Sequence, residues 1–181
     1  MTTSWAEPAY QALVRSGVTI VGYVPDGGLK DLIVLLDDDP TVKTVRLTTE
    51  EEGVALATGA WLGGARAAVL MQSSGVGNCI NMLSLLASCE VPAFHLVTMR
   101  GEPGEANPWQ VPMGSVAGET MALMGVDVRR VTSADAVAAA ITRACLDTFD
   151  QRGPATAVLI DQTVIGHKQF TGDATTSGGS R

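Results

Sequence analysis

Basic residues are scarce in this chain of 181 residues: 12 lysines and arginines stand against 19 acidic residues, giving a formal charge of −7. Proteins that bind a phosphate backbone normally carry the opposite balance, so the composition argues against nucleic acid as a partner. No apolar run approaches the roughly eighteen residues of a membrane-spanning helix, and no basic segment followed by an apolar one opens the chain. We therefore expect no membrane contact and no signal peptide.

Cysteine and histidine are also rare. Cys79, Cys89 and Cys145 are odd in number, and their spacings match no zinc-binding pattern. Only His95 and His167 could supplement them as ligands. We expect no metal site formed by this chain alone, and we interpret the cysteines as buried thiols of a cytoplasmic protein.

What the chain has in quantity is small apolar residues. Hydrophobic residues make up 46% and charged residues only 17%, while aromatics are 4% and glycines number 20. This composition predicts a core of Ala, Val, Leu and Ile with close backbone approaches. The length fits a single domain, for which we predict the boundaries 1–168, followed by a polar and disordered tail at 169–181.

Strand and helix patterns alternate along nearly the whole chain. Ser4 and Glu7 form a capping-box pattern before a first helix, and the later helices alternate with continuous apolar strands. This order predicts an α/β fold: a three-layer, doubly wound, mainly parallel sheet of six strands. The expected strands are 18–24, 41–47, 66–71, 92–98, 126–131 and 155–160. Ligands of such sheets bind beyond the carboxyl ends of the strands, which selects the loops 25–28, 48–52, 72–78 and 99–118.

Three consecutive acids, Glu50 to Glu52, begin the helix after the second expected strand. Acids stabilise a helix N-terminus, and this explains two of the three. Glu50 would share its helix face with Gly53, Val54 and Ala57. A carboxylate above such small residues suits a flat ligand and proton exchange, although a plain capping role explains the pattern equally well.

The glycine-rich segment Ser73–Asn78 follows the third expected strand. It fails as a dinucleotide fingerprint, because Ile80 occupies the third glycine position and no acid follows at the required distance. Two interpretations stay open. It is a tight loop that exposes backbone groups to a flat ligand, or a simple strand-to-helix turn.

The loop 99–118 is long, and loops of this length are often functional. It contains Arg100, a side chain suited to gripping a sulfonate, phosphonate or carboxylate, unless a neighbouring acid neutralises it. Lys30, by contrast, has the position of a solvated helix charge, and His95 that of a core histidine with its hydrogen bonds satisfied.

Four blocks together resemble the pyrimidine-binding domain of thiamine-diphosphate enzymes. The likeness is strongest to the α subunit of sulfopyruvate decarboxylase and next to phosphonopyruvate decarboxylase, and it covers about residues 5–165. The blocks read EEEGVALATG (50–59), VLMQSSGVGN (69–78), RGEPGE (100–105) and QVPMG (110–114), with VPD (24–26) and LK (29–30) adding to the second likeness.

The resemblance implies a catalytic role for Glu50. In this family a glutamate nine residues before a glycine, here Gly59, hydrogen-bonds N1′ of the aminopyrimidine and so promotes loss of the C2 proton. Glu51 takes this role if the register shifts by one. The reaction implied is decarboxylation of a 2-oxo acid to an aldehyde and CO₂. The residues implied at the cofactor are Pro25, Ser73, Ser74, Gly75, Gly77 and Asn78, and those at the substrate are Asp26, Arg100, Glu102 and Gln110.

One family motif is missing from the chain. The Gly-Asp-Gly motif, with its later Asn, holds the diphosphate and Mg²⁺ in these enzymes, and neither Asp26 nor Asp173 lies in such a motif. The resemblance thus implies a β subunit that carries this motif, in an α2β2 or larger hetero-oligomer that is active only when complete.

The substrate side departs from the family pattern. Met99 stands where sulfopyruvate-type sequences tend to have His, and Asp26 is followed by two glycines instead of Ser. Phosphonopyruvate decarboxylation and acyloin-forming carboligation therefore remain alternatives. A flavodoxin-like module that binds flavin or nucleotide alone, and a scaffold subunit without activity, are the alternatives of another class.

Overall fold

The computed structural model describes residues 5–166. Their six strands form one sheet in the order β2-β1-β3-β4-β6-β5, and every neighbouring pair is parallel. The expected doubly wound sheet is confirmed, and it is parallel throughout. No helix within this range is long and apolar enough to cross a membrane. The strands are β1 (Val18–Tyr23), β2 (Lys43–Arg46), β3 (Arg66–Gln72), β4 (Phe94–Thr98), β5 (Asp127–Val131) and β6 (Thr156–Ile160).

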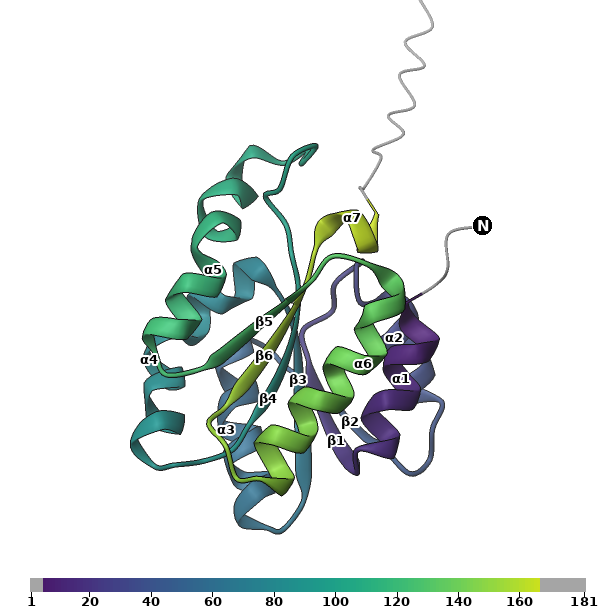
Figure 1. Ribbon diagram of the computed structural model, residues 1–181, viewed down its shortest axis with the longest axis vertical. Helices are drawn as coiled ribbons and strands as arrows, with labels where there is room; N and C mark the ends of the chain where they lie inside the picture. Colours follow the sequence, from purple (N-terminus) through teal and green to yellow (C-terminus); the bar gives the residue numbers. More distant parts are fainter. Residues whose placement is uncertain (1–4, 167–181) are drawn as a thin grey trace, which may run out of the picture.

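Helices cover both faces of the sheet (Figure 1). One hydrophobic cluster lies between the sheet and helices α1, α2 and α6, and a second lies between the sheet and helices α3, α4 and α5. The helices are α1 (Ala6–Arg15), α2 (Lys30–Asp37), α3 (Glu50–Leu62), α4 (Ser73–Ser88), α5 (Val111–Leu123), α6 (Ala134–Cys145) and α7 (Gln162–Ile165), with shorter turns η1 (Pro108–Gln110) and η2 (Leu146–Asp150).

Two expected loops are largely helical. The segment 73–78 forms the first turns of α4 rather than a loop, and α5 begins at Val111, within the expected loop 99–118. Pro112 is compatible with α5 because the first turn of a helix needs no amide donor there. Gly114 lets α5 pack against the carbonyl of Arg100, where a Cβ would collide with the oxygen.

Two of the three cysteines have the expected environment, and the third does not. Cys79 and Cys145 are buried as expected, whereas Cys89 is exposed at the end of α4; all three are free thiols. Helix α7 was not expected. Ser4, which would complete the first capping box, and the tail 169–181 lie outside the described residues.

The sheet reverses its strand order between β1 and β3. From β1 the chain crosses to the edge strand β2 through α2, and it then returns to β3 through α3 on the other face. In open parallel sheets the crevice above such a reversal is the usual ligand site. The segments that follow β1, β3 and β4 meet at this end of the sheet.

Candidate functional site

Glu50 is the first residue of α3, directly after the extended N-cap residue Thr49. The three acids of this turn have different environments. Glu52 accepts a hydrogen bond from the Thr48 amide at 2.8 Å, so it caps the helix, and Glu51 is exposed. Glu50 is only 8% exposed. The capping interpretation therefore holds for Glu52, while Glu50 is turned into the protein.

The Glu50 carboxylate lies against the first turns of α4. Asn78 Nδ2 donates a hydrogen bond to Glu50 Oε2 at 2.8 Å. Glu50 Oε1 lies against Gly75, where an added Cβ would overlap the carboxylate. Below it, Gly53, Val54 and Ala57 are all buried, as the helical spacing predicted. The glycine in α4 thus makes the space that the carboxylate occupies.

Cys79 lies one turn beyond Gly75 on α4 and is fully buried. Burial, and then the charges of Glu50 and Glu51, raise the pKa of its thiol to about 12. A thiol with this pKa stays protonated and is a poor nucleophile. Cys79 is therefore no candidate nucleophile, which leaves the Glu50 carboxyl as the candidate reactive group at this contact between α3 and α4.

Asp26 joins the carboxyl ends of three strands across the reversal of the sheet. Its Oδ1 accepts a hydrogen bond from Gln72 Nε2 at 2.7 Å, and its Oδ2 accepts from the Gly28 amide at 3.0 Å and Thr98 Oγ1 at 3.3 Å. Gln72 Oε1 in turn accepts from Ser74 Oγ at 2.7 Å. Asp26 and Thr98 line a cavity of about 170 Å³. Sequence reasoning missed Gln72 and Thr98, whose only signal is their position at strand ends.

Arg100 lines the same cavity, but its guanidinium is paired with an acid. Nε and one terminal nitrogen donate to the two oxygens of Glu105 at 2.6 and 2.5 Å. The two side chains are 8% and 2% exposed. The bidentate contact holds the pKa of Glu105 well below its usual range, helped by the amides of Asn107 and Gly101. The alternative left open for Arg100, pairing with a neighbouring acid, is what the structure shows.

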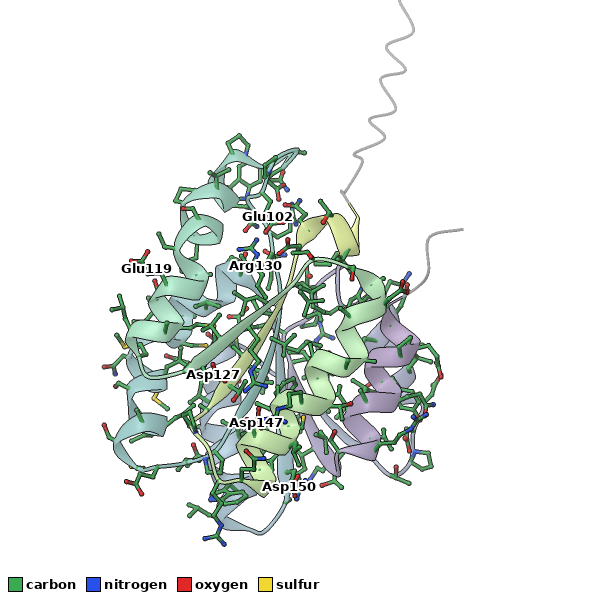
Figure 2. The ribbon with its side chains drawn as sticks, viewed as in Figure 1. Glu102, Glu119, Asp127, Arg130, Asp147 and Asp150 are labelled. Carbon is green, nitrogen blue, oxygen red and sulfur yellow. The ribbon has the colours of Figure 1, made fainter. Side chains whose placement is uncertain are left out.

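Glu102 is likewise used within the chain. It pairs with Arg130 of β5 and accepts a hydrogen bond from the Gln162 amide at 2.7 Å. Figure 2 shows the Glu102 and Arg130 side chains next to each other where the strands end. Gln162 Nε2 also donates to Glu105 at 2.9 Å. The turn 100–105 is therefore anchored to β5 and α7.

The segment 99–113 also packs beside the start of α4. The Arg100 amide donates to Ser73 Oγ at 3.0 Å, and a Cβ on Gly77 would come within 3.2 Å of Met113 Sδ. Gln110, one turn before Met113, has a buried Oε1 without a hydrogen-bond partner among residues 5–166. An orphaned buried oxygen of this kind is expected where a ligand supplies the missing donor.

The chemistry of two of these side chains suits an aminopyrimidine ring. A buried carboxylate can bind a ring nitrogen, and the orphaned amide oxygen of Gln110 can accept from an amino group. Of the residues expected at the cofactor, Gly75 and Asn78 contact Glu50, whereas Ser74 and Pro25 are exposed and Pro25 lies on the other side of the Asp26 loop.

Comparison with solved structures gives the class of this fold. A 4-hydroxybenzoylformate decarboxylase from Rhodococcus jostii, described as thiamine diphosphate-dependent, superposes with a TM-score of 0.72 at 16% identity, over 92% of this chain and 31% of that one. A 2-oxoglutarate:ferredoxin oxidoreductase from Magnetococcus marinus gives 0.69 at 12% identity, over 90% and 29%. The chain has the fold of one domain of such enzymes.

Sequence comparison narrows the class to a family. Sulfopyruvate decarboxylase subunit alpha of Methanothermobacter thermautotrophicus is 35% identical over 71% of this chain and 79% of its own length. That of Methanococcus maripaludis is 41% identical over 60% and 66%. Phosphonopyruvate decarboxylase of Streptomyces viridochromogenes is 39% identical over 64% of this chain, but only 30% of its own length is covered. No family model matches the chain. The chain belongs to the sulfopyruvate decarboxylase alpha-subunit family, which confirms the resemblance.

Proposed function

We propose that this chain is the α subunit of a split, thiamine-diphosphate-dependent decarboxylase that converts a 2-oxo acid to an aldehyde and CO₂. The observation that carries the proposal is the buried Glu50 carboxylate, held by Asn78 over Gly75. The names of the relatives, sulfopyruvate and phosphonopyruvate decarboxylase, support the reaction class.

Glu50 is assigned as the proton-exchanging group. Its carboxyl group would share a proton with N1′ of the aminopyrimidine, while Asn78 fixes the group through Oε2. When bound, thiamine diphosphate supplies the nucleophilic carbon and the electron sink that decarboxylation needs. Gln110 Oε1, which lacks a partner within residues 5–166, would accept from the cofactor or substrate.

The substrate side is assigned to the Asp26 loop and the segment after β4. Asp26 would face the substrate from its anchored position on Gln72 and Thr98. Arg100 and Glu102 act by holding the turn, because both are paired inside the chain. Phosphonopyruvate decarboxylation, or acyloin formation by trapping the same reactive carbon with an aldehyde, remains the second candidate because of the Streptomyces relative.

A β subunit would complete the site. It would hold the diphosphate and Mg²⁺, since the chain lacks the Gly-Asp-Gly motif. Large apolar side chains exposed on α4, η1 and α5 support a partner surface: Leu85, Trp109, Val111, Val116 and Leu123. We propose an α2β2 or larger assembly. The three free thiols further support a cytoplasmic location.

The test is reconstitution with a chain that carries Gly-Asp-Gly. We expect the isolated chain to be inactive and the pair to decarboxylate sulfopyruvate or phosphonopyruvate. Glu50→Gln should lower kcat by about 10²–10⁴-fold. Glu51→Gln, an exposed neighbour of equal charge, is the matched control and should leave kcat unchanged. Full turnover by Glu50→Gln would refute the assignment. Aldehyde release measured against acyloin release separates decarboxylation from carboligation.

A further inference from the structure

The Arg100 pair raises a question about how an anionic substrate is held. Two of the five N–H donors of the Arg100 guanidinium are bonded to the two oxygens of Glu105, and both side chains are nearly buried. Releasing Arg100 for a substrate would leave Glu105 as a buried and unpaired charge, which is strongly unfavourable. Because the charge of Arg100 is already balanced within the chain, a second cation at the carboxyl end of the sheet would strengthen the binding of such a substrate.

A second cavity opens on the other side of the Asp26 loop, and we name it the β1–α2 cavity. It measures about 450 Å³ and lies between the ends of β1 and β2 and the first two turns of α2. This volume falls in the range of small-molecule sites. Asp26 and Gly27 line both this cavity and the smaller one beside Arg100. The two hollows therefore adjoin across one loop.

The β1–α2 cavity contains two cations without acidic partners. Lys30, the first residue of α2, and Arg46, the last of β2, line it from opposite elements. Among residues 5–166, neither has a carboxylate within ion-pair distance. Most arginines of the chain do have such a partner, namely Arg66, Arg100, Arg129, Arg130 and Arg143. Two cations without acidic partners beside one cavity are unexpected in a chain with a net charge of −7.

The acids around this cavity are engaged elsewhere. Asp26 accepts hydrogen bonds from Gln72, Gly28 and Thr98, on the side of the loop toward the sheet. Asp37 accepts a hydrogen bond from the Tyr23 hydroxyl at 3.3 Å. The rest of the lining includes apolar residues, Pro25, Ile33 and Val34. An apolar wall with two cations suits a compact anion better than a long peptide.

We propose that the β1–α2 cavity binds the sulfonate or phosphonate end of the substrate, with Lys30 and Arg46 as its ligands. Arg46 offers the planar fork that matches two anionic oxygens, and Lys30 adds a point charge. The identity of the anion rests on the proposed function, whereas the existence of the anion site rests on the cavity alone. Specificity for a second anionic group would then come from residues other than Glu50 and its contacts on α4.

The direct test is an NMR titration of the full chain with sulfoacetate and with phosphonoacetate, two stable compounds with one such group and a carboxylate. We expect both to shift the backbone amide signals of Gly27, Lys30 and Arg46, and acetate to leave them nearly unchanged. Lys30→Met and Arg46→Met should each weaken binding about fivefold, the upper range for one exposed ion pair. Lys43→Met is the matched control, since Lys43 is an exposed cation of β2 outside the cavity.

A kinetic arm separates this inference from the proposed function. In the reconstituted pair, Lys30→Met and Arg46→Met should raise KM for sulfopyruvate or phosphonopyruvate about fivefold, with kcat and the KM for pyruvate unchanged. Equal changes with pyruvate, amide shifts no larger than those with acetate, or the same weakening in Lys43→Met would overturn the inference. A pair inactive on every 2-oxo acid would refute the proposed function, and the titration would still decide the cavity.

Discussion

Replacing Gly75 with alanine should displace the Glu50 carboxylate without altering any charged residue. The added Cβ would overlap Glu50 Oε1, the Cδ and the Cγ, and Glu50 is only 8% exposed, so the side chain has little room to retreat. The Glu50–Asn78 hydrogen bond would be lost or lengthened in the process. The substitution therefore tests whether the glycine exists to admit the carboxylate.

The expected change in the free energy of unfolding can be judged against Gly59, a helical glycine of α3 with nothing within 4 Å of an added Cβ. Glycine to alanine in a helix gains about 0.5–1 kcal/mol when space is free. At Gly59 we expect that full gain. At Gly75 the overlap adds a cost of about 1–3 kcal/mol, typical of overpacking. Gly75→Ala should thus be less stable than Gly59→Ala by about 1–3 kcal/mol.

Urea unfolding of both variants measures this difference, and kcat of the reconstituted pair measures its consequence. A displaced proton-exchanging group costs on the order of 10²-fold in rate for about 1 Å of movement. Gly75→Ala should show this loss. If Gly75→Ala is stabilised as much as Gly59→Ala and keeps full turnover, the close contact between α3 and α4 has no catalytic meaning.

Two further predictions concern buried charge. His95 is fully buried, and burial lowers its pKa to about 4, below the unfolded value of about 6.5. As the pH falls, the unfolded chain therefore binds the proton first. The free energy of unfolding should fall by about 3 kcal/mol between pH 6.5 and pH 4. His95→Leu should flatten this part of the urea-measured stability curve, and parallel curves would contradict the prediction. Glu105→Gln leaves the Arg100 charge buried without its partner and should cost about 3 kcal/mol. Asp150→Asn, which breaks the more exposed pair with Arg66, should cost less than about 1 kcal/mol, and equal losses in the two variants would contradict the argument.

The sheet could be predicted from the sequence because its signals are local. The buried strands β3, β4 and β6 are continuous apolar runs, and the helices between them have clear apolar faces. The starts of α4 and α5 could not be predicted, because both segments are rich in glycine, which has a low helix propensity. Tertiary contacts outweigh that propensity: Gly75 admits Glu50, and Gly114 admits the carbonyl of Arg100.

The candidate site was likewise predictable where its signals are local and unpredictable where it depends on tertiary contacts. Glu50 could be placed on the buried face of α3 because the spacing to Gly53, Val54 and Ala57 lies within one helix. The Asp26–Gln72 hydrogen bond joins residues 46 positions apart, and no local pattern encodes it. His95 was expected in the core with its hydrogen bonds satisfied; it is in the core beside the Thr156 backbone, but neither ring nitrogen makes a hydrogen bond of normal geometry within residues 5–166. Side-chain pairing of this kind depends on the packed structure.

The placement of charge supports the proposed partner chain. The proposed cofactor and substrate are both anionic, and the chain itself carries −7. At the carboxyl ends of the strands, where the ligands must lie, Arg100 and Arg130 are paired with acids. Within residues 5–166, this leaves Lys30 and Arg46 as the unpaired cations at that end, because Arg15 and Arg152 precede strands and Lys43 is the first residue of β2. Two cations can hold one sulfonate or phosphonate, but they leave no positive charge for a diphosphate. We therefore expect the diphosphate and its Mg²⁺ to be bound by the partner chain.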